Sequence, residues 1–117
     1  TIVTQCVPPA ESDLPGAEEY RNLLKKYFPA DKPNFVSFEG FINAKVLVEM
    51  LNKAGRELTR DGFITAGESI KNLDVGLGDA KITYSSTDHR GLDQVYYTVI
   101  IDGKYQVVED FKSLKTY

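Results

Sequence analysis

Residues 35–55 read FVSFEGFINAKVLVEMLNKAG, and this stretch decides the fold because it predicts one long helix. Its apolar residues recur at i, i+3 and i+4 spacing, the period of an amphipathic helix. The periodic positions are Phe41, Ala44, Leu47, Val48, Leu51 and Ala54, and Ile42, Val46 and Met50 widen the stripe. Ser37 is placed to cap the N-terminus of the helix, and Gly55 to end it. So wide an apolar surface predicts a helix that is packed on most sides, between other helices or against a sheet.

Two polar residues interrupt this apolar surface near its N-terminal end. Glu39 and Asn43 fall inside the apolar arc, where each needs a hydrogen-bond partner. One interpretation is that they line a solute cleft, where the partial positive charge of the helix N-terminus favours a ligand carboxylate. The alternative is that Glu39 stabilises the first turn and Asn43 bonds a neighbouring loop. For each residue taken alone, the alternative is the simpler interpretation.

Composition and charge limit the class of protein. The 117 residues are 42% hydrophobic and 26% charged, which is typical of one globular domain. A net charge of −3, without a cluster of Lys or Arg, argues against nucleic acid or an anionic membrane surface as partner. No apolar run approaches the roughly 20 residues that a transmembrane helix needs. Cys6 is the single cysteine, so an internal disulfide is excluded.

Local patterns predict the remaining elements. We expect a strand at 1–7, a helix from about Pro15 to Phe28, and a further helix that is capped by Thr59 and continues its apolar face to Leu73. After these we expect a flexible loop at 76–79, strands at 81–84, 94–101 and 104–108, and a frayed tail at 109–117. Asp102-Gly103 predicts a hairpin turn. This order indicates an α/β fold with too few strands to close a sheet between helix layers. The chain also starts without Met, on a strand-like run and with no signal peptide, so we expect a piece of a longer protein.

The turn SSTDHRG at residues 85–91 invites an enzymatic interpretation, because Asp–His pairs orient imidazoles for base catalysis. Adjacent residues on a tight turn rarely form such a pair, however. Thr87 and Asp88 are better placed to cap the turn through their own backbone, beside His89. The sequence has no G-x-S-x-G motif and no second histidine for a metal site. We therefore expect no enzyme, no metal and no cofactor.

Four segments, in this order, resemble type I periplasmic solute-binding proteins of ABC transporters, most closely the leucine/isoleucine/valine-binding branch. They are TQCVPP at 4–9, EEYRNLLKKYFP at 18–29, the long helix with LTRDGFITAGESIKNLD at 58–74, and ITYSSTDHRGLDQVYYTVIIDGKYQVV at 82–108. The resemblance covers nearly the whole chain, whereas a full member is about three times longer. It implies that residues 1–117 form a single partial domain, the C-terminal segment of a two-lobed protein. That segment would hold three helices, a terminal β-hairpin and an N-terminal crossing strand, with hinge strands at 1–8 and 99–108.

The resemblance also implies a function. A periplasmic receptor of this kind closes two lobes around a small solute, here an amino acid of the branched-chain type, and delivers it to the membrane permease of an ABC transporter. The implied ligand-binding residues are Gln5, Phe35, Phe38, Glu39 and Asn43. Backbone pairing is the simpler role for Gln5, and a core position the commoner one for Phe35 and Phe38. An alternative function is a stand-alone interaction domain without solute binding, which forms homo-oligomers through exposed strand edges.

Overall fold

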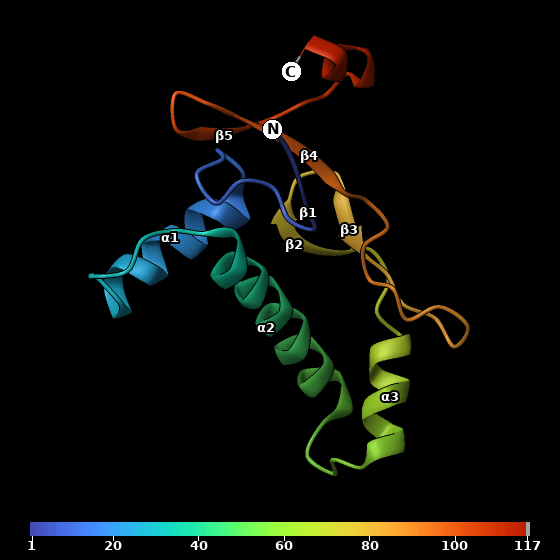
Figure 1. Cartoon of the computed structure of the whole chain (residues 1–117). Coiled ribbons are helices and arrows are strands. Elements are labelled where there is room, and N and C mark those ends of the chain that lie inside the picture. Colours follow the sequence, from blue (N-terminus) through green and yellow to red (C-terminus); the bar gives the residue numbers. More distant parts are fainter. Residues whose placement is uncertain (117) are drawn as a thin grey trace.

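The computed structural model describes residues 1–116, without the side chain of Phe111. In chain order the elements are β1 (Ile2–Gln5), α1 (Pro15–Tyr27), α2 (Phe35–Ala54), α3 (Arg60–Glu68), β2 (Leu73–Leu77), β3 (Ala80–Ile82), β4 (Tyr96–Ile101), β5 (Lys104–Val107) and the 3₁₀ helix η1 (Phe111–Thr116). Figure 1 shows two parts: α1, α2, α3 and the β2–β3 hairpin form a helix–hairpin body, and β1, β4 and β5 form a separate three-stranded sheet beside it. This sheet is named the hinge sheet, after the hinge role that the resemblance predicts for residues 1–8 and 99–108. The fold is therefore the α/β arrangement that the sequence predicts.

The long helix α2 begins two residues earlier than predicted, because Asn34 and not Ser37 is its N-cap. The Ser37 backbone N–H donates to Asn34 Oδ1 at 3.0 Å. The hydroxyl of Ser37 is engaged elsewhere, in a 2.5 Å hydrogen bond with the hydroxyl of Tyr20 on α1. Gly55 ends the helix with φ 76°, a left-handed conformation that glycine adopts without strain, so this prediction is confirmed.

The prediction that α2 is packed on most sides is wrong for the described part of the chain. Phe38, Ile42 and Val46 are buried, and α1, α3 and β2 contact this side of the helix. The opposite side carries Val36, with 82% of its surface exposed, and an exposed apolar patch. Its other members are Leu47, Val48 and Leu51. The physical reason is that all the elements packed against α2 lie on one side of it.

Close backbone contact joins α1 to the β2–β3 hairpin. A Cβ added to Gly16 would lie 2.7 Å from the carbonyl oxygen of Val75, and one added to Gly76 would lie 2.4 Å from the Gly16 nitrogen. Residues 73–77, which include part of the predicted flexible loop, are therefore a strand held against the start of α1. The two glycines of the predicted loop have different roles: Gly78, with φ 68°, lies in the turn between β2 and β3, whereas Gly76 belongs to β2 and permits the close packing.

The third helix ends at Glu68, five residues before the predicted end. Thr59 caps its start as predicted, since its Oγ1 accepts from the Gly62 backbone N–H at 3.1 Å. At the other end Lys71 Nζ donates to the carbonyl oxygens of Glu68 and Tyr84. These bonds satisfy the end of the helix and tie it to the segment after β3. Leu73 consequently belongs to β2 and not to the apolar face of α3.

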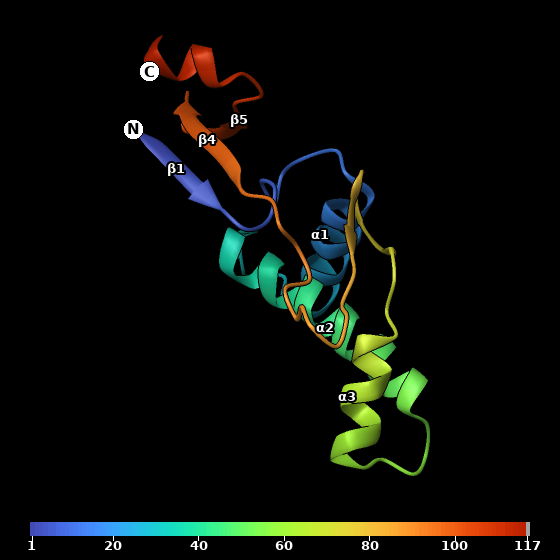
Figure 2. The same cartoon turned by 90° about the vertical axis from the view of Figure 1, so that its right-hand side faces the viewer.

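The hinge sheet has the strand order β1-β4-β5 and is antiparallel throughout. Gln5 pairs with Tyr96 and Ile2 with Val99, so the N-terminal strand lies against β4, which is far from it in sequence. The hairpin between β4 and β5 is confirmed: Asp102 and Gly103 have φ 51° and 75°, as a type I′ turn requires. Figure 2 shows the three strands beyond the N-terminal end of α2.

The molecule is thin, and much of its apolar surface is exposed. Its principal extents are 52 × 36 × 18 Å and its radius of gyration is 16.4 Å. A compact domain of this length has a radius of gyration of about 13 Å. Residues 111–116 form η1 where the sequence predicts a frayed tail, because Asp110 caps this turn by accepting from the Lys112 N–H at 2.9 Å. The rest of that prediction, Tyr117, lies outside the described residues.

Candidate functional site

Three residues of α2 form a row on the side of the helix that faces the segments leaving β1 and entering β4. Phe35, Glu39 and Asn43 are spaced four residues apart, so their side chains follow one another along the same face of the helix. Glu39 and Asn43 line a cavity of about 180 Å³. The opposite wall comes from residues 6–7 after β1, from residues 91–92 ahead of β4, and from Ile82 and Tyr84 at the end of β3. The cavity therefore lies between the helix, the end of the β2–β3 hairpin and both segments that cross to the sheet.

Phe35, the first residue of that row, contacts the hinge sheet directly. It is half-buried, and its ring meets the ring of Tyr105 on β5 edge-on, with centroids 4.8 Å apart and an angle of 80° between the planes. Edge-to-face pairs of this kind are favourable beyond the area that they bury. Phe35 thus lies against the sheet, one turn of α2 before Glu39, and is not among the residues that line the cavity.

Glu39 and Asn43 are more exposed than the sequence predicts. Both side chains are exposed, and among the described residues neither has a hydrogen-bond partner. The expectation that protein groups satisfy them inside an apolar arc is therefore wrong. They present a carboxylate and an amide to the cavity, and both can bind a ligand non-covalently. The N-terminus of α2 adds a partial positive charge close by.

The two remaining predicted residues lie elsewhere. Phe38 is 0% exposed and belongs to the core, with its ring centroid 5.1 Å from that of Tyr20. Gln5 is half-buried in β1, where its backbone pairs with Tyr96. The structure thus brings Phe35, Glu39 and Asn43 together. Gln5 lies one residue before Cys6, which does line the cavity. Cys6 itself is exposed and follows β1, because the strand predicted at 1–7 ends at Gln5.

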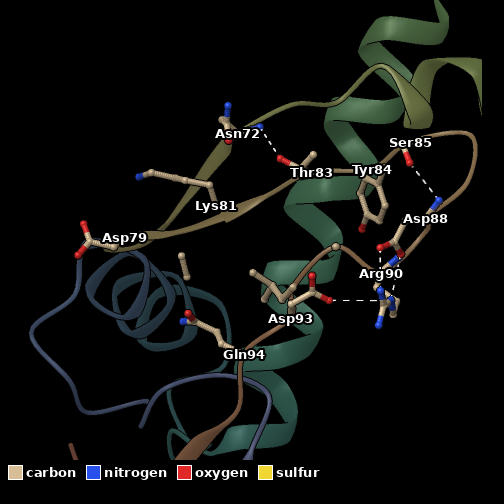
Figure 3. Close-up of a pocket in the computed structure, with 13 residues that line it drawn as sticks. Asn72, Asp79, Lys81, Thr83, Tyr84, Ser85, Asp88, Arg90, Asp93 and Gln94 are labelled. Atoms are coloured by element: carbon tan, nitrogen blue, oxygen red, sulfur yellow. Dashed lines mark hydrogen bonds and ion pairs between the residues drawn. The ribbon is translucent and has the colours of Figure 1, made fainter.

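A second, polar cavity of about 630 Å³ lies between the β2–β3 hairpin and the loop that leads to β4 (Figure 3). The sequence does not indicate this cavity, because its walls come from two segments that only the fold brings together. Its charged groups are largely paired: Arg90 Nη2 lies 2.9 Å from Asp88 Oδ2, and Lys81 Nζ 2.8 Å from Asp74 Oδ2. The polar residues that line it and that the sequence analysis did not single out are Asn72, Asp79, Lys81, Thr83, Tyr84, Ser85, Arg90, Asp93 and Gln94.

The 85–91 turn forms one wall of this cavity and is held by its own side chains. Ser85 Oγ accepts from the backbone N–H groups of Thr87 and Asp88, and Asp88 Oδ1 accepts from the Arg90 N–H at 2.9 Å. The capping role predicted for Asp88 is confirmed, whereas Ser85 takes the role predicted for Thr87. Hydrogen bonds from the Arg90 side chain, and then from its backbone, lower the pKa of Asp88 to about 2. Burial raises the pKa of the neighbouring Tyr84.

The catalytic pair that the turn suggests does not form. His89 Nε2 lies 3.0 Å from Glu68 Oε1 on α3, while the carboxylate of Asp88 is bound to Arg90. The adjacent residues therefore point to different partners. Within residues 1–116, no group of three His, Cys, Asp or Glu side chains is placed to hold a metal ion.

No helix in the described residues combines the length and the apolar character that crossing a membrane requires.

Comparison with known proteins places this geometry in a family. The family model described as periplasmic binding protein matches residues 1–105. A possible leucine/isoleucine/valine-binding protein from Rhodopirellula baltica SH 1 is 34% identical, with a TM-score of 0.84 over 92% of this chain. A fatty acid ABC transporter substrate-binding protein from Thermomonospora curvata is 26% identical over the same share, with a TM-score of 0.75. No curated protein matches the chain.

A third solved structure shares the fold. A substrate-binding periplasmic protein from Ralstonia solanacearum is 24% identical over 92% of this chain, with a TM-score of 0.75. In each case this chain spans only a part of the relative, from 29% of the Rhodopirellula and Thermomonospora chains to 31% of the Ralstonia chain. The sequence, the α/β fold and the family match agree: this chain belongs to the periplasmic binding protein family.

Proposed function

We propose that this chain is part of an extracytoplasmic solute-binding receptor of an ABC transporter, and that its solute is an amino acid of the branched-chain type or a similar small acid. The observation that carries the proposal is the row of Phe35, Glu39 and Asn43, which faces a cavity beside both crossing segments. The 34% identity to a possible leucine/isoleucine/valine-binding protein supports the choice of solute. Membership of a receptor family supports a binding role rather than catalysis.

The residues of the row have complementary chemistry for such a solute. The carboxylate of Glu39 would accept hydrogen bonds from the ligand ammonium, and Asn43 would offer both a donor and an acceptor. Phe35 would supply an apolar wall for the ligand side chain. Gln5, next to the cavity-lining Cys6, is the hinge residue best placed to reach the same ligand. Phe38 would act only indirectly, by packing beneath the row.

The mechanism we propose is cleft closure. Residues 1–117 would form a single partial domain, with hinge segments at 1–8 and 99–108, and the parent protein would supply the rest of the two lobes. A solute that contacts both lobes binds the closed state more tightly than the open state. The difference between the two binding free energies is the amount by which the solute stabilises the closed state. The closed receptor would then deliver its solute to a membrane permease in the periplasm.

A second candidate function is self-association without a solute, as an interaction domain. All four residues of the edge strand β5 are exposed, and so is the apolar side of α2. An unpaired strand edge and an apolar patch of this kind both favour pairing with a second copy of the chain. Sedimentation analysis across a range of protein concentrations separates the two functions, because only self-association predicts that the average molecular mass rises with protein concentration.

Amide NMR of the chain titrated with leucine, and in parallel with glucose, tests the receptor proposal. Leucine should shift the resonances of residues 35–43 and of the crossing segments. Glu39→Gln removes a charged hydrogen-bond acceptor, worth about 1.5–3 kcal/mol, so binding should weaken roughly 10- to 100-fold. Glu49→Gln, on the same helix but paired with Lys53, is the matched control and should leave binding unchanged.

Two results would count against the proposal. If leucine and glucose both leave the spectrum of a folded chain unchanged, this chain does not bind the solute by itself. If Glu39→Gln and Glu49→Gln weaken leucine binding equally, the binding site does not lie at the α2 row.

A further inference from the structure

The orientation of the hinge sheet relative to the helix–hairpin body depends on few groups. Two chain segments cross between them, residues 6–9 after β1 and residues 91–95 before β4. Residues 6–9 read CVPP, and Val7, Pro8 and Pro9 are buried, whereas residues 93–95 of the second crossing are exposed and lie outside regular structure. A side-chain contact between the two parts adds to these crossings in fixing the angle of the sheet.

Phe35 and Tyr105 make such a contact. Phe35 is the first residue of α2, and Tyr105 lies on β5, opposite Ile100 of β4. Their edge-to-face geometry, 4.8 Å between centroids and 80° between planes, is the arrangement that aromatic rings prefer. Tyr105 keeps 39% of its surface exposed, so burial in a core does not explain its position.

The contact lies at one end of the row that forms the candidate site. Glu39 and Asn43 follow Phe35 along α2 and line one wall of the 180 Å³ cavity, while Cys6 and Leu92 of the crossing segments line the other. Val7 belongs to the core of the body, Leu92 packs against that core, and Ile82 and Tyr84 complete the lining. The cavity walls are therefore held by the body, and the contact with the sheet acts on Phe35, at the end of the row.

We propose that Tyr105 is a positioning residue of the solute site: its ring fixes Phe35 and holds the hinge sheet against the start of α2. The proposal rests on the proposed function for the identity of the site. Tyr105 itself would not touch the solute. It would act through Phe35, so its loss should alter the arrangement of the two parts before it alters either part.

Residual dipolar couplings of backbone amides report this arrangement directly. In the unmodified chain, one alignment tensor should fit both the helices and the strands β1 and β4. In Tyr105→Leu the strands should require a tensor of their own with reduced order, while the couplings within each part stay consistent. Tyr105→Phe keeps the ring and should preserve the common tensor. Tyr27→Leu, which removes an exposed tyrosine from α1, is the matched control and should preserve it as well.

Phe35→Leu probes the same pair from the helix side and should give the same separation of tensors as Tyr105→Leu. A common tensor in both leucine variants would overturn the proposal. So would separate tensors in the unmodified chain, because the ring pair would then not hold the sheet. If one leucine variant fails to fold, the other supplies the test.

Leucine titration of the same variants separates this inference from the proposed function. Loss of an edge-to-face pair should weaken leucine binding roughly two- to tenfold in Tyr105→Leu, with full recovery in Tyr105→Phe. If the leucine variants need separate alignment tensors but the unmodified chain binds no leucine, the result supports the positioning role of Tyr105 and counts against leucine as the solute. Leucine binding that is equal in the unmodified chain and in Tyr105→Leu would support the solute and count against the role of Tyr105.

Discussion

The helix–hairpin body and the hinge sheet are held together by different forces. The body buries large apolar side chains such as Phe38, Ile42 and Val75, and brings two backbone segments into contact at Gly16 and Gly76. The sheet buries only Thr98 and Val99 among the described residues of its three strands. It relies on the hydrogen-bond register between β1, β4 and β5. Stability should therefore depend on packing in the body and on register in the sheet, and four substitutions test this difference.

The largest effect is expected from Phe38→Ala in the body. Phe38 is fully buried against Tyr20, and its truncation leaves a cavity, so the free energy of unfolding should fall by about 3–5 kcal/mol. Urea denaturation monitored by circular dichroism measures the change. Ile100→Ala on the exposed face of β4 is the control, with an expected cost of about 0.5 kcal/mol or less. Equal costs at the two positions would show that the sheet is packed as tightly as the body.

Gly76→Ala should come next, because two penalties combine at this position. Gly76 has φ 86°, and a Cβ would lie 2.4 Å from the Gly16 nitrogen, so strain and overpacking together should cost about 2–4 kcal/mol. Gly103→Ala in the sheet hairpin has a similar φ of 75° but open space around its Cβ. This control should cost about 1–2 kcal/mol. If the two variants melt at the same denaturant concentration, the α1–β2 contact adds nothing to stability.

A smaller effect is expected for Thr98→Val, which tests the register of the hinge sheet. The buried Thr98 Oγ1 donates to the carbonyl oxygen of Val3 at 2.9 Å, across the β1–β4 pair. Valine keeps the shape of the side chain but removes the donor, at a cost of about 1–2 kcal/mol. Faster hydrogen exchange at the amides of β1, with the helices unchanged, is the expected readout. Thr4→Val, at an exposed position of β1, is the control and should leave hydrogen exchange unaltered.

The smallest effect is confined to the 85–91 turn and appears only in acid. Because the folded-state pKa of Asp88 lies near 2, below its usual value, its bonds to Arg90 contribute above about pH 4 and are lost as the pH falls through about 2. Carbon NMR of the Asp88 carboxyl should give a midpoint near 2. In Arg90→Gln the midpoint should rise toward the usual value of about 3.9. An unchanged midpoint would mean that Arg90 does not set the ionisation of Asp88.

Local rules account for the parts of the fold that the sequence predicts correctly. Apolar periodicity predicts α2, and a side-chain oxygen before an apolar run predicts the start of α3 after Thr59. The pair Asp102-Gly103 predicts the β4–β5 turn. Each depends on the conformation of neighbouring residues, which a short stretch of sequence specifies. The same rules correctly place Glu39 and Asn43 on one face of a helix.

The errors arise where distant segments meet. Asn34 and not Ser37 caps α2, and the hydroxyl of Ser37 instead forms a hydrogen bond with the hydroxyl of Tyr20 on another helix. Residues 76–77 extend β2 where it contacts Gly16 of α1, so that only residues 78–79 of the predicted loop form a turn. The polar cavity in Figure 3 and the partner of His89 likewise depend on segments that are far apart in the chain. Side-chain type and spacing carry no information on such contacts.

By itself, the sequence determined the helices, the hairpin, the family resemblance and the shared helix face of Glu39 and Asn43. Only the tertiary structure decided that Phe38 is core, that one side of α2 is exposed, and that the site row meets the hinge sheet through Tyr105. The physical reason is the range of the forces involved. Periodicity and capping act within a turn or two of the chain, whereas burial and ring contacts depend on how whole elements pack.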